Sequence, residues 1–165
     1  LFIGGTGLPL TATTDAIPLW LDVLAAAVLA MCYPVYFSMP IRTFGWAFLA
    51  GGLAHAAHWV ALTWWHWNAP ASSLLACLVA GGLLTPVCHS RHIPFAGAGF
   101  AAVVALVPGV YLFRTAAGAL SLLSLAHGKA ALEATASDLT TAALIVLAMT
   151  VGLVVPYRVW ARLAR

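Results

Sequence analysis

Two histidines, His55 and His58, lie three residues apart in the apolar stretch GGLAHAAHW. On a helix they would share one face with Ala47 and Gly51. Imidazole groups on such a face can relay protons, hydrogen-bond a substrate or bind a metal. The neighbouring sequence offers no carboxylate to complete a metal site. We therefore expect His55 to bind substrate or transfer protons, with helix packing as the alternative, and we expect no metal or other cofactor.

The pair Pro108-Gly109 interrupts the apolar run ALVPGVYLFRTAAGAL, and Arg114 follows five residues after the glycine. Such a pair breaks a helix, and the amide groups at the start of the second half-helix can receive a carboxylate. Arg114 and Ser121 would extend this site along the half-helix. These four residues and His55 are the predicted substrate-binding residues. The alternative is a plain kink, with Arg114 in a structural ion pair.

Asp22 and Asp138 are the carboxylates that lie closest to the apolar runs. In proton-coupled carriers, carboxylates within the membrane bind and release protons as access alternates. Both residues also lie near predicted helix N-termini, where an aspartate favours the helix dipole and caps free amide groups. Proton coupling and helix capping therefore both stay open for Asp22 and Asp138.

The elements that carry these residues are predicted to cross a membrane. The sequence is 64% hydrophobic and only 7% charged, whereas soluble domains carry about 25% charged residues. A membrane-spanning helix needs about 20 apolar residues. The runs are continuous and rich in Ala and Leu, which excludes the alternating pattern of a membrane barrel. The expected fold is an all-α integral membrane protein. The four longest segments without a charged residue are 23–41, 43–90, 92–113 and 139–157.

About five passages fit these segments. Residues 1–16 are predicted to be a lead-in segment or linker, 17–160 a polytopic membrane domain and 161–165 a basic cytoplasmic tail. We expect Pro86 and the polar turn after it to end the third passage. The uninterrupted passages are expected at about 17–38, 44–64, 71–87 and 137–156.

The fourth passage falls within residues 95–127 and is predicted to be discontinuous. One straight helix over this range would be about 50 Å long, against a hydrocarbon core of about 30 Å. Two full spans would need about 40 residues and a polar turn. We therefore expect a short helix to about Leu106, a break at Pro108-Gly109 and a second helix from Val110 to His127.

Basic residues predict the orientation of the chain. Five arginines follow the first, third and fifth passages, whereas the opposite side holds only Lys129. Loops rich in Lys and Arg stay in the cytoplasm. The N-terminus is therefore expected outside and the C-terminus in the cytoplasm. The five arginines are Arg42, Arg91, Arg158, Arg162 and Arg165.

Several other functions find no support in the sequence. The net charge of +3 reflects these arginines at the membrane edges and gives no reason to expect nucleic acid binding. The three cysteines form neither a disulfide framework nor a CxxC metal motif. No nucleophile elbow, HExxH motif, P-loop or GxGxxG fingerprint is present, so we do not expect an enzyme.

Four motifs occur in an order that resembles a known family. They are FSMPIR after the first passage, GWAFLAGGLAHAAHW in the second, VPGVYLFRTAAG in the fourth and AMTVGLVVP in the last. In this order they resemble the C-terminal membrane half of the threonine/serine exporter family, over about Trp20 to Trp160.

The resemblance implies a secondary carrier of the bacterial inner membrane that exports threonine and serine and is driven by the proton gradient. It also implies a companion half or subunit with further membrane helices and a soluble region. The positions that match the family's features are Asp22, Pro40, Arg42, Gly51, His55, Pro108, Gly109 and Gly152.

Three alternatives stay open. Some members that resemble this subunit are associated with dicarboxylate export, succinate in particular. A membrane haem protein would use His55 with His89 or His127, and a scaffold subunit would not transport at all. Because five passages are few for a complete carrier, we expect a companion half or a homo-oligomer in the lipid bilayer.

Overall fold

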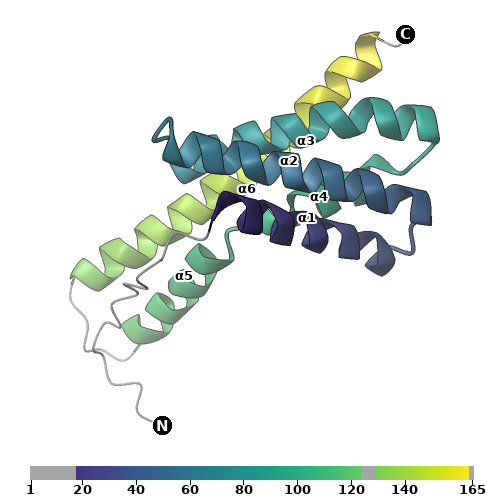
Figure 1. Ribbon diagram of the computed structural model, residues 1–165. Coiled ribbons are helices and arrows are strands. Elements are labelled where there is room, and N and C mark those ends of the chain that lie inside the picture. Colours follow the sequence, from purple (N-terminus) through teal and green to yellow (C-terminus); the bar gives the residue numbers. More distant parts are fainter. Residues whose placement is uncertain (1–17, 124–128, 164–165) are drawn as a thin grey trace.

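A computed structural model describes residues 18–123 and 129–163, which form six α-helices and two short 3₁₀ helices with no strand (Figure 1). This confirms the predicted all-α fold. The predicted lead-in segment and the predicted helix end at His127 lie outside the described residues. The elements are α1 (Leu19–Tyr36), η1 (Ile41–Thr43), α2 (Phe44–Thr63), α3 (Ala69–Arg91), α4 (Phe95–Val103), η2 (Val104–Leu106), α5 (Gly109–Leu122) and α6 (Lys129–Leu163).

Helices α1 to α4 pack as a bundle, and α6 lies against α3 (Figure 1). The bundle core consists largely of small side chains, among them the fully buried Ala50, Ala54 and Ala80. Small residues let helix backbones approach closely inside a membrane. Gly51 of α2 packs against Ala30 of α1 so tightly that a Cβ atom would collide. The same holds for Gly152, where a Cβ atom would lie 2.6 Å from Cβ of Cys77.

Helix α3 begins earlier and ends later than the sequence predicts. Asn68 caps its N-terminus by accepting a hydrogen bond of 3.0 Å from the amide of Ala71. The prediction that Pro86 ends this helix is wrong, because Pro86 lies inside it. A proline is tolerated within a membrane helix where packed neighbours replace the lost hydrogen bond. The helix ends instead at His92, whose left-handed backbone has φ 53° and whose amide bonds to Cys88.

Helix α6 is also longer than predicted, starting at Lys129 rather than near residue 137 and including residues 161–163 of the predicted tail. Its 35 residues extend over about 52 Å, well beyond a hydrocarbon core of about 30 Å. Residues 129–141 therefore project past the bundle beside α5, and we call these two segments together the arm (Figure 1).

The fourth passage is broken where the sequence predicts. Helix α4 with η2 and helix α5 meet at a bend of 65°, with Val107 and Pro108 between them. Beyond the bend α5 packs mainly against α6. None of the residues of α5 is buried.

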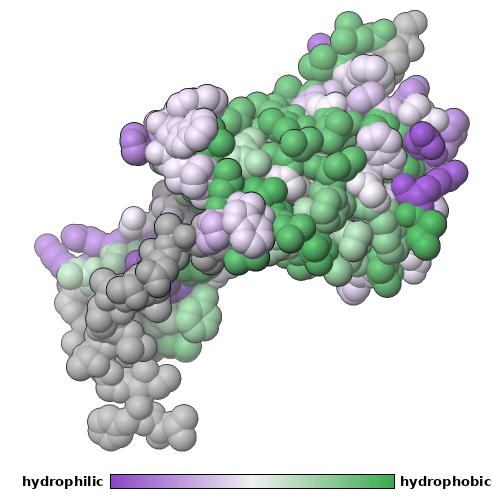
Figure 2. Space-filling model, in the orientation of Figure 1, coloured by the Kyte–Doolittle hydropathy of each residue, from purple (hydrophilic) through white to green (hydrophobic). Residues whose placement is uncertain are grey.

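Three of the described helices, α1, α3 and α6, are long and apolar enough to cross a membrane, and the bent pair would be a fourth span if its two helices cross together. Helix α2, with 20 residues, is not among them. The surface of the bundle is nevertheless apolar, with hydrophilic residues gathered at its ends and on the arm (Figure 2). Large exposed side chains such as Leu49, Leu147 and Val151 suit contact with lipid. The chain is a multi-pass membrane protein.

Candidate functional site

A cavity of about 180 Å³ lies where the break in the fourth passage faces α2. Four parts of the chain form its wall: the last turns of α2, the first turns of α3, the break itself and the middle of α6. The structure thus brings the predicted residues His55, Pro108 and Gly109 to one site. The residues that line the cavity include His55, His58, Ser73, Pro108, Gly109, Val110, Tyr111 and Ile145.

His55 joins the cavity to α1. Its Nε2 atom lies 2.9 Å from Oδ2 of Asp22, in a partly buried contact between α1 and α2. Because the carboxylate accepts, Nε2 carries the proton, and the lone pair of a neutral His55 is left on Nδ1. Asp22 therefore fixes the tautomer of the residue that lines the cavity.

The free nitrogens of the two histidines are buried. Nδ1 of His55 and Nδ1 of His58 have no hydrogen-bond partner among the described residues, and both side chains line the cavity. The two rings lie 6.1 Å apart, measured between their centroids. Because buried polar atoms are nearly always hydrogen-bonded in proteins, these nitrogens mark the cavity as a place for a polar ligand.

The break supplies hydrogen-bond donors, the backbone amides at the start of α5, whereas the two histidine nitrogens are acceptors. Pro108 precedes α5, and the amide of Gly109 turns back to the carbonyl of Val107 at 2.7 Å. Leu112 makes the first hydrogen bond of the helix, to Pro108 at 3.0 Å. The amides of Val110 and Tyr111 lie before that bond, in the turn where helices have free N–H groups and partial positive charge. Both residues line the cavity.

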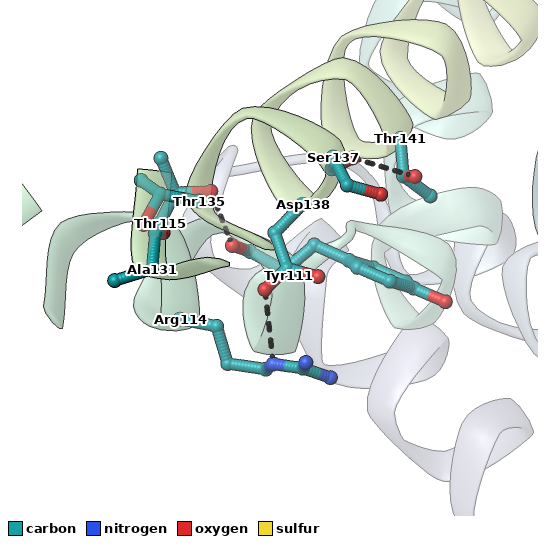
Figure 3. A network of polar contacts seen from close by, with 8 residues as sticks. All are labelled: Tyr111, Arg114, Thr115, Ala131, Thr135, Ser137, Asp138 and Thr141. Atoms are coloured by element: carbon teal, nitrogen blue, oxygen red, sulfur yellow. Dashed lines mark hydrogen bonds and ion pairs between the residues drawn. The ribbon is translucent and has the colours of Figure 1, made fainter. Parts of the chain in front are cut away.

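Arg114 and Asp138 form an ion pair in the arm, with 3.0 Å between Nε and Oδ2 (Figure 3). The Arg114 side chain is 53% exposed and the Asp138 side chain 13% exposed. Neither residue lines the cavity. A structural ion pair is the alternative that the sequence leaves open for Arg114, and Asp138 is its partner.

Ser121 also lies in the arm and not at the cavity. Its hydroxyl donates to the carbonyl of Gly118 at 2.7 Å. Thr135 packs against Gly118 from α6, and its own hydroxyl donates to the carbonyl of Ala131 (Figure 3). The structure therefore separates the predicted site residues into two groups, one at the cavity and one between the helices of the arm.

Most of the lining residues were not predicted from the sequence, among them Ser73, Tyr111 and Ile145. Ser73, which is buried, and Ile145 come from helices whose alignment with the break depends on tertiary packing. Tyr111 follows Gly109 by two residues, so its closeness to the break was a signal that the sequence did contain.

The described residues include no group of three or more His, Cys, Asp or Glu placed to hold a metal ion. His89, one partner considered for a haem with His55, lines a different cavity. The other, His127, lies outside the described residues.

Comparison with known proteins adds one family. Residues 22–159 match the family model described as "Threonine/Serine exporter, ThrE". This match contains both residues of the His55–Asp22 pair, the break and the arm. No solved structure matches the chain significantly.

Proposed function

Because the chain belongs to the threonine/serine exporter family, we propose that it is one subunit of a proton-coupled carrier that exports threonine and serine across the bacterial inner membrane. The family is one of transporters, so the chain is a membrane protein of the exporter type. The observation that carries the finer proposal is the cavity shared by the His55–Asp22 pair and the helix break.

The two ends of an amino acid find opposite partners in this cavity. The carboxylate binds the free amides of Val110 and Tyr111, where the start of α5 carries partial positive charge. The ammonium group donates a hydrogen bond to Nδ1 of neutral His55, whose other nitrogen is held by Asp22.

Proton coupling uses the same atom, Nδ1 of His55. A proton that arrives from the outer side binds Nδ1 of His55 and converts the ring to an imidazolium, which Asp22 stabilises at 2.9 Å. The ammonium group of the substrate then loses its acceptor and meets a like charge, so it leaves. Because proton and ammonium exclude each other at one atom, inward proton movement drives outward substrate movement.

The size of the cavity supports a small substrate. A volume of about 180 Å³ equals the share of roughly six water molecules at about 30 Å³ each, which suits an amino acid with a short side chain. The buried Ser73 on the wall offers a hydroxyl to hydrogen-bond the hydroxyl of serine or threonine.

The charges support an amino acid over a dicarboxylate. The described residues that line the cavity include neither Lys nor Arg. Arg114, the cation closest in sequence to the break, is held by Asp138 in the arm. A second carboxylate would therefore enter the cavity without a permanent cation beside it, which is costly within a membrane.

The proposal includes five passages. Helix α2 packs between α1 and α3 and has the length of a full span at 20 residues. With α2 included, the turns that hold Arg42 and Arg91 lie at one end of the bundle, which we place in the cytoplasm. A companion half completes the carrier.

The test is export from proteoliposomes that hold the chain with and without its companion half. Vesicles are loaded with labelled threonine, serine or succinate, and an inward proton gradient is applied. The Asp22→Asn variant is expected to lower gradient-driven threonine export about tenfold or more, because the imidazolium loses its counter-ion. Glu133→Gln, which removes an exposed carboxylate of α6, is the matched control and keeps full export.

Two results would overturn this function. Normal gradient-driven export by Asp22→Asn would remove the pair from proton coupling. Export of succinate without threonine or serine would replace the proposed substrate class.

A further inference from the structure

A second and larger cavity, of about 820 Å³, lies at the opposite end of the bundle. It opens between the end of α3, the turn before α4 and the last turns of α6, where α6 leaves the bundle (Figure 1). The transport mechanism above makes no use of it. The lining residues that matter for its chemistry are His89, Ser90, His92, Phe95, Tyr157 and Trp160.

The segments that form this cavity carry three arginines, although none of the three lines it. Arg91 adjoins the lining residues His89, Ser90 and His92 in the chain, and Arg158 and Arg162 lie one turn apart on α6 beside Tyr157 and Ala161. All three arginines are exposed. This end of the molecule therefore offers several cationic donors around one opening.

No carboxylate offsets these charges. The sequence has no Asp or Glu between residues 23 and 132 or between residues 139 and 165. The two ion pairs among the described residues, His55–Asp22 and Arg114–Asp138, involve none of these arginines. The positive charge at this end is thus available to an anion from outside the chain.

The wall of the cavity is apolar and aromatic. The rings of Phe95 and Tyr157 stack with 5.0 Å between their centroids, and Trp160 lines the same side. Tyr and Trp residues favour the level of the lipid headgroups, where one end of the ring is wet and the other is in contact with acyl chains. Ile93, which is buried, continues the apolar wall toward the core.

We infer that this cavity binds the headgroup of an anionic phospholipid. Its phosphate lies beside the lining residue His89, with the exposed Arg158 and Arg162 of the adjoining turns of α6 as further donors. Its glycerol and first acyl carbons lie against Phe95, Tyr157 and Trp160. Basic pockets between membrane helices bind such headgroups in this way. A free phosphate ion would use the basic residues but would leave the aromatic wall without a partner, which favours the lipid. The site is independent of the transport proposal.

The test is native mass spectrometry of the purified full chain in detergent, titrated with phosphatidylglycerol or with phosphatidylcholine of the same acyl chains. We expect phosphatidylglycerol to bind at least about tenfold more tightly than phosphatidylcholine, because each arginine near the headgroup contributes several-fold. The double variant Arg158→Gln/Arg162→Gln is expected to lower this preference to about twofold or less.

Arg42→Gln is the matched control, since Arg42 lies in η1, a segment that contributes no residue to the lining of this cavity, whereas Arg158 and Arg162 adjoin the lining residues Tyr157 and Ala161. It is expected to keep the preference, so an equal loss in this variant would mean a general charge effect and would overturn the site. Trp160→Ala tests the aromatic wall and is expected to weaken the binding of both lipids by the same factor. Equal binding of the two lipids to the unchanged protein would overturn the inference. So would displacement of phosphatidylglycerol by inorganic phosphate at equal concentration, which would indicate a site for free anions.

Discussion

The two ring nitrogens of His55 differ in their surroundings. Nε2 bonds to a carboxylate of α1, whereas Nδ1 is buried without a partner among the described residues, and the residue itself lines the cavity beside the helix break. A single imidazole in this position connects the charge state of one helix to the contents of the cavity. The proposed exchange of proton for ammonium needs no other titrating group.

The His55→Gln variant tests this role. Glutamine can still donate to Asp22, so the contact between α1 and α2 is kept, but it cannot take up a proton near neutral pH. We expect gradient-driven threonine export to fall about tenfold or more and the remaining flux to become insensitive to external pH. Flux is measured in proteoliposomes over an external pH range of about 5 to 8, in which histidine side chains change charge.

The matched control is His66→Gln, in the turn before α3 and away from this cavity. It is expected to show the flux and the pH profile of the unchanged protein. A His55→Gln variant that kept its pH response would assign coupling to another group.

At the scale of elements, the arm is joined to the rest of the molecule mainly through α6, and the Arg114–Asp138 pair lies between its two helices. Because Arg114 is half exposed, the pair is worth about 1 kcal/mol or less. We expect Arg114→Gln and Asp138→Asn each to lower the melting temperature in detergent by up to about 4 °C. The double variant is expected to lose no more than the larger single loss, because it leaves neither charge unpaired.

Transport by the same three variants separates structure from substrate binding. If the pair only joins the helices, all three keep most of their threonine export. Loss of export in Arg114→Gln alone, with export by Asp138→Asn intact, would return Arg114 to the substrate-binding residues predicted from the sequence.

The contact between α3 and α6 depends on Gly152. A Cβ atom there would lie 2.6 Å from Cβ of Cys77 and 3.0 Å from the carbonyl of Leu74. We expect Gly152→Ala to destabilise the protein by about 1–3 kcal/mol, seen as a melting temperature lower by roughly 2–12 °C. Gly82→Ala is the control, because a Cβ atom at Gly82 meets no atom within 4 Å. An unchanged melting temperature for Gly152→Ala would show that the helices can separate without loss.

The sequence predicted the elements better than their ends. Charge-free apolar runs located the helices, and Pro108-Gly109 located the break. The prediction that Pro86 ends α3 was wrong because neighbouring helices support the helix around this proline. The sequence does not show which helices are neighbours. The start of α6 was predicted too late because its first residues are polar, and a helix that projects beyond the membrane can carry polar residues.

The site could be predicted only in part, for a related reason. His55 and the break each have a local signal, but the bond from His55 to Asp22 joins residues 33 positions apart. The separation of Arg114 from the cavity likewise depends on the 65° bend and on the position of α6. The spacing of residues along one helix predicts neither the bond from His55 to Asp22 nor the separation of Arg114 from the cavity.

At the scale of the whole molecule, the proposed five passages place the turns at the two ends of α2 on opposite sides of the membrane. Cysteines at the exposed positions Ile41 and Trp65 test this in a Cys32→Ser background, since Cys77 and Cys88 are buried. An impermeant maleimide added to intact cells is expected to label Trp65→Cys, and to label Ile41→Cys only after permeabilisation. Labelling of both from the same side would mean that α2 does not cross.

The bond between His55 and Asp22 also bears on how the chain enters the membrane during synthesis. Asp22 lies in the first turn of α1 and His55 lies within α2. An unpaired aspartate in an inserting helix costs up to about 3 kcal/mol, a cost that is highest at the helix centre. The bond joins the polar group of α1 to that of α2, so each lowers the cost of inserting the other. The translocon would then release α1 and α2 into lipid together, as a helical hairpin. In a chain that lacks α1, α2 would stay at the bilayer surface and would not cross the membrane.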